Sequence, residues 1–574
     1  MIKTLKTFYS FVARRKALFA FFILLTVITE GLLSIGPYFY KLFVDQFVEL
    51  NYQKLINLLF LFMAVKVVSH ILNIVGYYLG DVLVFDAAAK ARIAIFKFVQ
   101  DLDFAFHSSK STGSLISAFK RGDGAFFNLF FTIHHRIISV LTNVFVMSYF
   151  FTALDARILL LTIGSFVITL IAAKFLVRIN VVKRSLFNKE EDNISGIIVD
   201  NMINYETVKL FAKENWEQRR LKEAFLPWKK TLWGYANSFR LIDISIGAII
   251  NLTIFFVLFI SLNLAVSDKL TVGEFVLIAS FLSFFFAQLW DLVWSFRDIA
   301  KNYSDIETYF GLLDNKILIK DPSVPSEIEK VDGEIEFKNV HFSYGERKKN
   351  AINGLSLKIR QGQAVALVGR SGSGKTTFVK LLMRFFDPQK GIITLDEVDL
   401  RNLKKSVLRS YIGVVPQEPI LFNNTIIYNI GYGKENATSQ EIKAAAAMAN
   451  IDQFIETLPE KYETQVGERG VKLSGGQKQR LAIARMILSQ PNVIIFDEAT
   501  SHLDSESENL IQDAFWKARQ NKTTIIIAHR LSTVMRADKI VVMENGKIAE
   551  MGSHNELLDK KESLYKHFWQ LQMR

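Results

Sequence analysis

The chain has 574 residues, of which 69 are basic and 56 acidic, and its formal charge is +13. Half of the residues are hydrophobic and 13% are aromatic, which excludes a disordered chain and an ordinary soluble enzyme. The absence of cysteine excludes disulfides, cysteine-bound metals and thiol nucleophiles, although it does not identify the compartment.

Positive charge is concentrated in the first part of the chain. Residues 321–574 carry 35 basic and 31 acidic residues, so subtraction from the totals leaves 34 and 25 for residues 1–320. A basic, apolar first part followed by a nearly neutral second part indicates contact with a lipid bilayer rather than with nucleic acid.

Six segments are apolar over the length of about 20 residues that a helix needs to cross a bilayer. Two long polar connections, 86–136 and 178–243, carry most of the lysine and arginine together with the N-terminal tail. The positive-inside rule therefore places both termini and both connections in the cytoplasm. The expected spans are 17–44, 55–85, 137–153, 158–177, 244–266 and 272–296.

The long connections contain few helix breakers, so we expect the spans to continue as helices into the cytoplasm, with breaks near 106–113 and 204–211. No cleavage site follows the first apolar run, and no segment rich in arginine and serine precedes it. These features predict a mature first span and, by default, a bacterial inner membrane.

A segment punctuated by prolines, Asp321-Pro-Ser-Val-Pro-Ser326, indicates a domain boundary. We expect a transmembrane domain at 1–320 and a second domain at 321–574. In the second domain, apolar strands alternate with helical segments, which predicts a mainly parallel α/β sheet. The expected strands include 334–340, 364–368, 493–496 and 524–528.

A glycine-rich loop follows the strand at 364–368. Its sequence, Gly369-Arg-Ser-Gly-Ser-Gly-Lys-Thr-Thr377, matches the P-loop pattern in the strand-to-helix context that the pattern requires. Backbone N–H groups and the helix start would hold the phosphates of ATP, Lys375 would bridge the β- and γ-phosphates, and Thr376 would bind Mg²⁺. The residues expected to contact ATP here are Gly369, Ser371, Gly372, Ser373, Gly374, Lys375, Thr376 and Thr377.

Two adjacent acids, Asp497 and Glu498, end an apolar strand. Carboxylates at the end of a buried strand are costly without a cation. We therefore expect Asp497 to bind Mg²⁺ and Glu498 to act as the general base for the attacking water.

The sequence Leu473-Ser-Gly-Gly-Gln477 precedes a helix and forms a second anion-binding helix start, made of Ser474, Gly475, Gly476 and Gln477. One nucleotide does not need two such sites from one chain, so we expect this segment to reach the γ-phosphate bound to a second copy. With the P-loop, it resembles the ATPase domain of ABC transporters. The whole chain resembles an ABC half-exporter, in which a six-helix, all-α transmembrane domain precedes an α/β P-loop ATPase domain.

The resemblance implies roles for further residues. Tyr344 would stack on adenine, with a core tyrosine as the alternative, and Gln417 would sense Mg²⁺ and contact the membrane domain. Asp504 would belong to the loop at the dimer seam, and His529 would contact the γ-phosphate. His502 replaces a residue that is usually small in this family, and we expect it to alter the seam modestly. The implied catalytic residues are Lys375, Gln417, Glu498 and His529, and the implied Mg²⁺ ligands are Thr376, Gln417 and Asp497.

The resemblance also implies a dimer with twelve spans, in which two ATP molecules close the ATPase domains. Segments 106–114 and 203–211 would then be the coupling helices that connect the two kinds of domain. Because every catalytic consensus residue is present, a homodimer is favoured, and a heterodimer with a related half-transporter remains an alternative.

Polar residues inside the spans are candidates for contact with a small-molecule substrate. Hydrogen bonding between helices is the alternative role for each of them. These residues are Glu30, Lys66, His70, Asn73, Asn143, Asn251, Gln288 and Asp291.

Several cargo classes are compatible with the spans. A lipid or an amphipathic drug is the common cargo of this architecture. An alternative is a glutathione-type or metal-linked thiol conjugate, because Tyr205–Lys209 and Ile412–Gln417 resemble the heavy-metal and iron–sulfur exporter branch. Lys66, Arg136 and Arg240 could serve such an anionic cargo. A peptide exporter and an ATP-gated channel are less favoured, since the sequence shows neither a peptidase domain nor an added regulatory domain.

Overall fold

The computed structural model describes residues 2–48, 52–110, 112–345, 350–467, 470–497, 505–527 and 534–573. The chain divides into two compact units, each described here by itself. The first unit comprises Met1–Leu102 and Lys110–Lys316, and the second unit comprises Asp103–Ser109 and Ile317–Arg574.

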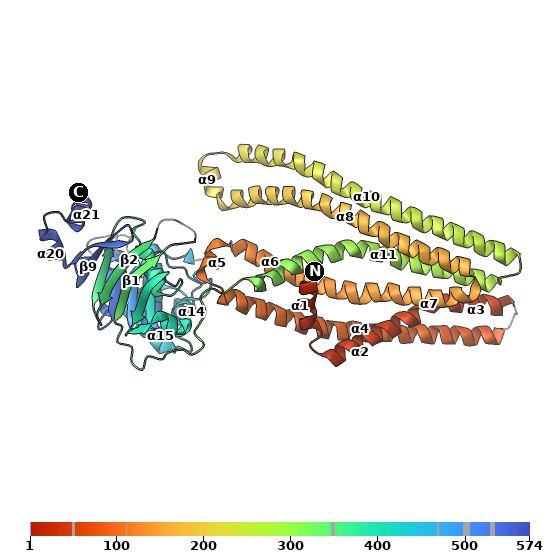
Figure 1. Ribbon diagram of the computed structural model, residues 1–574, viewed down its shortest axis with the longest axis horizontal. Coiled ribbons are helices and arrows are strands. Elements are labelled where there is room, and N and C mark those ends of the chain that lie inside the picture. Colours follow the sequence, from red (N-terminus) through yellow and green to blue (C-terminus); the bar gives the residue numbers. More distant parts are fainter. Residues whose placement is uncertain are drawn as a thin grey trace. The chain divides into compact units, whose positions relative to one another are not determined.

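The first unit is helical throughout its described part, and its long helices run side by side (Figure 1). Six helical segments are long and apolar enough to cross a membrane, which confirms the predicted number of spans. The elements are α1 (Ile2–Val12), α2 (Lys16–Ser34), α3 (Gly36–Val48), α4 (Tyr52–Asp101), α6 (Thr112–Phe131), η1 (Thr132–Ile137), α7 (Ile138–Leu154), α8 (Ala156–Ile203), α9 (Tyr205–Leu210), α10 (Glu214–Val266), α11 (Val272–Gly311) and η2 (Leu312–Asp314).

Local sequence sets several helix ends. The first span is split between α2 and α3, because Pro37 lacks the N–H group that a continuous helix needs there. At the start of α11, Thr271 Oγ1 accepts from Glu274 N and the Glu274 carboxylate accepts from Thr271 N, which forms a capping box. As expected from the sequence, the helices extend well beyond the bilayer thickness, since α4, α8 and α10 have 50, 48 and 53 residues.

Two apolar clusters hold the first unit together. One cluster joins α7, α8, α10 and α11 around fully buried residues such as Phe151, Ile246 and Phe281. The other joins α1, α2, α4, α6 and the end of α11 around Phe8 and Phe130. The long helices α8 and α10 pack along each other (Figure 1).

The second unit is built on two sheets. A four-stranded antiparallel sheet has the order β2-β1-β4-β5, and a six-stranded sheet has the order β10-β9-β3-β8-β7-β6, parallel except for the β9–β10 pair. The prediction of a mainly parallel sheet therefore holds for the larger sheet only. The strands are β1 (Ile335–Phe342), β2 (Ile352–Ile359), β3 (Ala364–Val368), β4 (Lys390–Leu395), β5 (Val398–Asp399), β6 (Ile412–Val415), β7 (Val493–Asp497), β8 (Thr523–Ile527), β9 (Lys539–Glu544) and β10 (Lys547–Gly552).

Alternate residues of the parallel strands enter two different cores. Ala366 and Val368 of β3 pack on one side, whereas Val365 and Leu367 pack on the other. All five residues of β3 are buried, as expected for a central parallel strand covered on both faces. The helical elements are α12 (Lys375–Leu382), η3 (Leu400–Asn402), α13 (Lys405–Ser410), α14 (Ile426–Gly431), α15 (Ser439–Met448), α16 (Asp452–Thr457), η4 (Lys461–Glu463), α17 (Gly475–Leu488), α18 (Ser505–Ala518), α20 (His554–Asp559) and α21 (Leu564–Met573).

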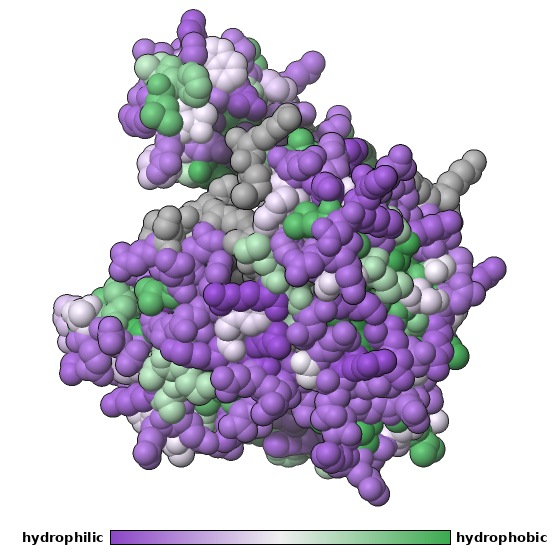
Figure 2. All heavy atoms as spheres, turned by 90° about the vertical axis from the view of Figure 1, so that its left-hand side faces the viewer, coloured by the Kyte–Doolittle hydropathy of each residue, from purple (hydrophilic) through white to green (hydrophobic). Residues whose placement is uncertain are grey.

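A short helix, α5 (Phe104–Ser109), packs with the second unit although it lies in the chain between α4 and α6. It falls at the break predicted near 106–113. The other predicted break, near 204–211, contains α9. The face of the molecule at the end of the second unit is largely hydrophilic, with hydrophobic residues scattered over it (Figure 2).

Candidate functional site

The P-loop connects β3 to α12 and depends on glycines with left-handed backbone conformations. Gly374 has φ +111°, and a Cβ atom placed on it would lie 2.8 Å from the Ala351 carbonyl oxygen. Gly369 is equally constrained, since a Cβ atom there would lie 2.3 Å from the Met543 carbonyl oxygen. Only glycine fits these positions, because a side chain would meet a backbone carbonyl oxygen.

Polar groups of the P-loop are arranged to receive phosphate. The Lys375 side chain is buried, and its Nζ donates to the carbonyl oxygens of Gly369 and Arg370 at 2.7 and 3.2 Å. The Ser373 Oγ is buried and has no hydrogen-bond partner among the described residues. A buried unpaired hydroxyl is costly. An ammonium, an unpaired hydroxyl and a helix start on one open loop fit a bound nucleotide phosphate.

Tyr344 lies beside this loop. Its hydroxyl donates to Thr377 Oγ1 at 3.2 Å, and its ring is half-buried against the edges of Phe342 and Phe386. The residue therefore contacts the core and the P-loop helix together. Ser371, Gly372 and Thr376, which complete the predicted set, are exposed or partly exposed at the loop surface.

The parallel strands bring the other predicted phosphate and Mg²⁺ residues to the same edge of the sheet. β3, β8, β7 and β6 are consecutive neighbours, and parallel strands end at a common edge. Asp497 ends β7 opposite Ile527 of β8, and Gln417 follows β6 with an exposed side chain. The sheet thus brings Gly369, Asp497 and Gln417, which follow or end parallel strands, to one edge.

The helix α17 begins at the predicted anion-binding segment. Ser474 Oγ accepts from Gln477 N at 3.3 Å, and Gln477 Oε1 accepts from Ser474 N at 2.9 Å. Ser474 and Gly475 are exposed, Gly476 is buried, and the Gln477 side chain serves as a cap. The remaining predicted residues Glu498, Asp504 and His529, together with His502, lie outside the described residues.

The segment around Gln417 is tied to α17. Gln479 donates its Nε2 to the Gln417 carbonyl oxygen at 2.6 Å. Arg485, further along α17, donates to the carbonyl and side-chain oxygens of Asn429 at 2.7 and 2.9 Å, and burial lowers the pKa of its guanidinium. Gln479 therefore fixes the backbone at Gln417, and Arg485 joins α17 to α14.

A second candidate site is a pocket of about 450 Å³ in the first unit, between α2, α4, α6, η1, α7 and α11. Four of the predicted cargo residues line it, and these are Glu30, Asn73, Gln288 and Asp291. Asn143 lies behind the wall, fully buried, and donates to Gln288 Oε1 at 3.1 Å.

The other predicted cargo residues lie elsewhere. Lys66 is partly buried, with its Nζ 5.6 Å from the centre of the Phe62 ring. His70 and Asn251 are exposed on α4 and α10 and do not line this pocket.

The pocket also contains Arg136, which the sequence suggested for a thiol-conjugate cargo, and residues that sequence reasoning missed, such as Tyr77, His135 and Ser139. The π-helical segment η1 carries His135 and Arg136, and π-helical turns are frequent at functional sites. The His135 ring stacks on Tyr77 with centroids 4.6 Å apart, and the Arg136 guanidinium pairs with Asp291 at 3.5 Å. Ser139 Oγ donates to Glu30 Oε2 at 2.7 Å. The two adjacent histidines before Arg136, at the start of an apolar span, are the signal that could have indicated His135.

Comparison with known proteins agrees with this arrangement. Residues 19–289 match the family model for the ABC transporter transmembrane region, and residues 352–501 match the family model for the ABC transporter. A solved structure of a bacterial Atm1-family ABC exporter with ATP bound has a TM-score of 0.86 and 31% sequence identity, covering 98% of this chain and 99% of that chain.

Curated relatives are longer than this chain. ATP-binding cassette sub-family B member 6 of Mus musculus is 37% identical over 488 residues, which are 84% of this chain and 57% of the relative. The mitochondrial iron-sulfur clusters transporter ABCB7 of Rattus norvegicus is 37% identical over 84% of this chain and 64% of its own length. Heavy metal tolerance factor 1 of Caenorhabditis elegans is 36% identical over 88% and 63%. The chain thus spans less than two thirds of each.

The two family models match in chain order, and the bacterial exporter matches along nearly the whole of both chains with the P-loop and sheet edge in place. The chain therefore belongs to the ABC transporter family, as a multi-pass membrane half-exporter that fuses one transmembrane domain to one ABC ATPase domain.

Proposed function

We propose that this half-exporter uses ATP to move a polar thiol compound, of the glutathione-conjugate or metal-linked class, across a membrane. The observation that carries the proposal is the polar lining of the pocket in the first unit. A lipid or drug-like cargo was the first expectation from the sequence, but an apolar cargo favours an apolar lining. Here, charged and amide side chains from several helices point to a polar cargo.

The pocket offers charges of both signs. Arg136 can hold a carboxylate through two N–H groups, whereas Glu30 and Asp291 can hold an ammonium group. A glutathione-type molecule carries carboxylates and an ammonium group together. The volume of such a molecule also suits the pocket, whose volume of about 450 Å³ lies within the usual range for small-molecule sites.

The names of two relatives support the same cargo class. One relative is an iron-sulfur clusters transporter and another is a heavy metal tolerance factor, so both names concern metals with affinity for sulfur. We therefore prefer the thiol class to lipids and drugs for this chain.

For the ATPase domain, we propose that Lys375 and the P-loop amides hold the phosphates and that Tyr344 holds the adenine. Mg²⁺, when held by Thr376, Asp497 and Gln417, would neutralise charge on the β- and γ-phosphates. Glu498 would accept the proton of the attacking water, and His529 would position the γ-phosphate. Hydrolysis then depends mainly on positioning and charge, with no covalent intermediate on the chain.

We further propose a homodimer. The exposed start of α17 offers an anion-binding segment that the chain's own P-loop does not need. In addition, the hairpin formed by α8, α9 and α10 ends in a group of exposed apolar residues, with Leu210 and Phe211 exposed by 83% and 69%. Such a group favours a protein partner, and in this family arrangement the partner is the ATPase domain of the second copy.

The membrane that we propose is the bacterial inner membrane, with the ATPase domain in the cytoplasm. The match to a bacterial exporter along nearly its whole length supports this choice. The mitochondrial relative leaves an organelle membrane as the alternative, which localisation in the source cell would decide.

The first experiment measures ATP hydrolysis by the full chain in lipid nanodiscs, with and without oxidised glutathione. We expect the thiol compound to raise turnover several-fold and Arg136→Gln to remove that stimulation while basal turnover persists. Arg157→Gln is the matched control, because Arg157 pairs with Asp155 in a link between spans. Turnover that ignores thiol compounds but rises with lipids or amphipathic drugs would refute the proposed cargo.

A further inference from the structure

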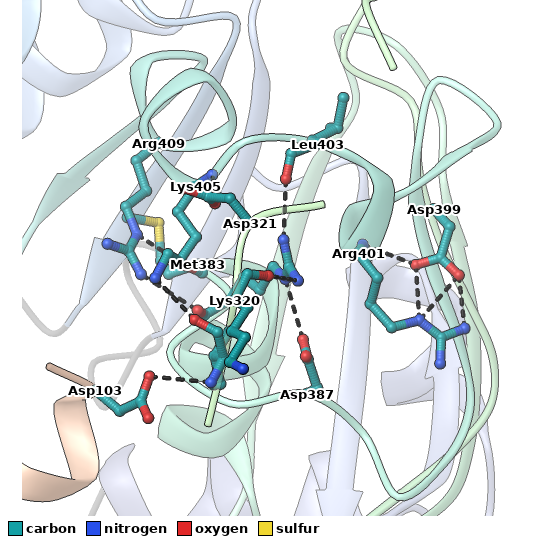
Figure 3. A network of polar contacts seen from close by, with 12 residues as sticks. Asp103, Lys320, Asp321, Met383, Asp387, Asp399, Arg401, Leu403, Lys405 and Arg409 are labelled. Carbon is teal, nitrogen blue, oxygen red and sulfur yellow. Dashed lines mark hydrogen bonds and ion pairs between the residues drawn. The ribbon is translucent and has the colours of Figure 1, made fainter. Parts of the chain in front are cut away.

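The segment that enters the ATPase domain, residues 317–321, is held by side chains from three other places in the second unit (Figure 3). Both carboxylate oxygens of Asp103 accept from this segment, from Leu318 N at 2.5 Å and from Ile319 N at 3.2 Å. Lys405 Nζ donates to the Ile319 carbonyl oxygen at 2.8 Å, and Lys405 N donates to Asp321 Oδ1 at 2.8 Å. The segment is therefore a fixed part of the unit rather than a loose tether.

Arg384 is the third attachment and connects the segment to the P-loop helix. It lies two residues beyond the end of α12, has a left-handed φ of +48°, and its side chain is only 4% exposed. Its guanidinium donates to the carbonyl oxygens of Lys320 and Leu403, both at 2.9 Å, and to Asp387 at 3.1 Å. One buried cation thus joins the entering segment to the C-terminal end of the helix that begins at Lys375.

The short helix α5 also contacts the end of the P-loop helix and the residues that follow it. Its Phe104 ring stacks on Phe385 with centroids 4.8 Å apart, directly after Arg384 in the chain. Lys380 of α12 lies over two rings, with its Nζ 5.2 Å from the centre of Phe104 and 5.7 Å from the centre of Tyr344. These contacts place α5 one side chain away from the residue proposed to hold adenine.

Asp103 lies where the chain passes from the first unit into the second unit. The chain passes between the two units at three places, after Leu102, after Ser109 and after Lys316. Asp103 is the first residue after the first passage, and its partners Leu318 and Ile319 follow directly after the third. A single carboxylate therefore ties two of the three covalent connections together.

We propose that Asp103 and Arg384 form a clasp that makes the entering segment, α5 and the end of the P-loop helix move as one body. A change at the nucleotide site then reaches α4 and α11 of the same chain through both covalent connections together. Asp103 and Arg384 are positioning residues, since neither touches ATP or cargo. The inference rests on the proposed ATP-driven dimer. It adds to that proposal a path within one chain by which a change at the nucleotide site reaches the transmembrane helices.

The experiment uses the absence of cysteine, which lets a single spin label be introduced directly. Lys269→Cys, at an exposed position between α10 and α11, gives one label per copy and hence one distance across the dimer. Vanadate and ATP should shift this distance in the otherwise unchanged chain. Asp103→Ala should lower the fraction of shifted dimers about tenfold, while ATP hydrolysis stays within about twofold of the parent.

Asp101→Ala is the matched control, because Asp101 is exposed and lies two residues earlier. It should leave both the shift and hydrolysis unchanged. A full distance shift in Asp103→Ala overturns the clasp. A parent chain that neither hydrolyses ATP nor shifts overturns the proposed function itself, so the two failures are distinguishable.

A second pair of variants distinguishes a role of Arg384 in transmitting the nucleotide-driven change from a role in stabilising the fold. Arg384→Lys keeps the charge but cannot reach three acceptors, whereas Arg401→Lys changes a nearby arginine that pairs with Asp399 (Figure 3). The clasp predicts a lower shifted fraction in Arg384→Lys at equal thermal midpoint and near-parent hydrolysis. Proportional losses of the midpoint, hydrolysis and the shift would instead show that Arg384 only stabilises the fold.

Discussion

The second unit and the first unit place their polar groups by different physical means. In the second unit, the P-loop depends on backbone conformations that only glycine adopts, and the sheet aligns Gly369, Asp497 and Gln417 at one edge. In the first unit, the pocket takes its residues from α2, α4, α6, η1, α7 and α11, and no short segment contains more than a few of them. Local geometry dominates one site, and packing between helices dominates the other.

This difference explains what a change at each site should do. A substitution in the proposed nucleotide site acts on a group expected to contact phosphate or on the loop that would hold it, so we expect a large effect on turnover. A substitution in the pocket acts on one of several weak contacts, so its effect is smaller and depends on cargo. The following predictions run from the largest expected effect to the smallest.

The largest effect is expected for Glu498→Gln. Loss of a general base should lower turnover by about 10²–10⁴-fold, while ATP binding is retained. Hydrolysis and nucleotide retention in nanodiscs measure the two properties separately. Turnover like that of the parent chain would show that Glu498 is not the base, and would weaken the view that short motifs determine this site.

Gly374→Ala tests the role of backbone geometry in the P-loop. The new Cβ atom meets the Ala351 carbonyl oxygen at 2.8 Å, and the left-handed φ costs roughly 1–2 kcal/mol, so we expect ATP affinity to fall at least about tenfold. Gly362→Ala is the control, because Gly362 has φ +70° with nothing within 4 Å of a Cβ atom. Equal ATP affinity in the two variants would contradict the argument from local geometry.

The same contrast determines how much the sequence could predict. The P-loop, the paired acids and the exposed start of α17 follow from motifs, because each motif depends on residues that are neighbours in the chain. Tyr77, His135 and Ser139 were not predicted, since their contacts depend on the π-helical segment and on packing between distant helices. His70 and Asn251 were predicted to contact cargo but are exposed and do not line the pocket, because a polar residue in a span does not reveal which way its helix faces. The antiparallel sheet was missed because β1 and β4 pair far apart in sequence.

Asn143→Ala tests the packing argument in the first unit. Asn143 is fully buried and donates to Gln288, so its loss should lower the free energy of unfolding by about 1 kcal/mol. Because Gln288 lines the pocket and loses this hydrogen bond, the stimulation of ATP hydrolysis by cargo should also decrease. Asn251→Ala, on the exposed surface of α10, should change neither the thermal midpoint nor the stimulation. If Asn251→Ala reduces stimulation more than Asn143→Ala does, the pocket is not where the cargo binds.

The smallest effect is expected at the C-terminal end of the second unit, where Glu550 accepts from Ser563 Oγ at 2.9 Å, from Leu564 N at 3.2 Å and from Tyr565 N at 3.4 Å. Burial raises the pKa of Glu550, but these hydrogen bonds and Lys560 outweigh burial and hold the pKa below its usual value. The carboxylate therefore contributes stability above the unfolded pKa of about 4.3, and this contribution is lost as the pH falls through the folded pKa.

The stability lost when Glu550 is protonated should be under about 1 kcal/mol, because solvent screens the ion pair with Lys560. Hydrogen exchange of the Leu564 and Tyr565 amides in the full chain measures it. Their protection should begin to fall below about pH 5 in the parent chain and continue to fall as the pH drops through the lowered pKa of Glu550, and it should start lower, with less dependence on pH, in Glu550→Gln. Equal pH dependence in both chains would show that another group controls the start of α21. The change should also leave ATP hydrolysis at neutral pH unaffected, because the Glu550 carboxylate accepts from Ser563, Leu564 and Tyr565, none of which is a predicted nucleotide residue.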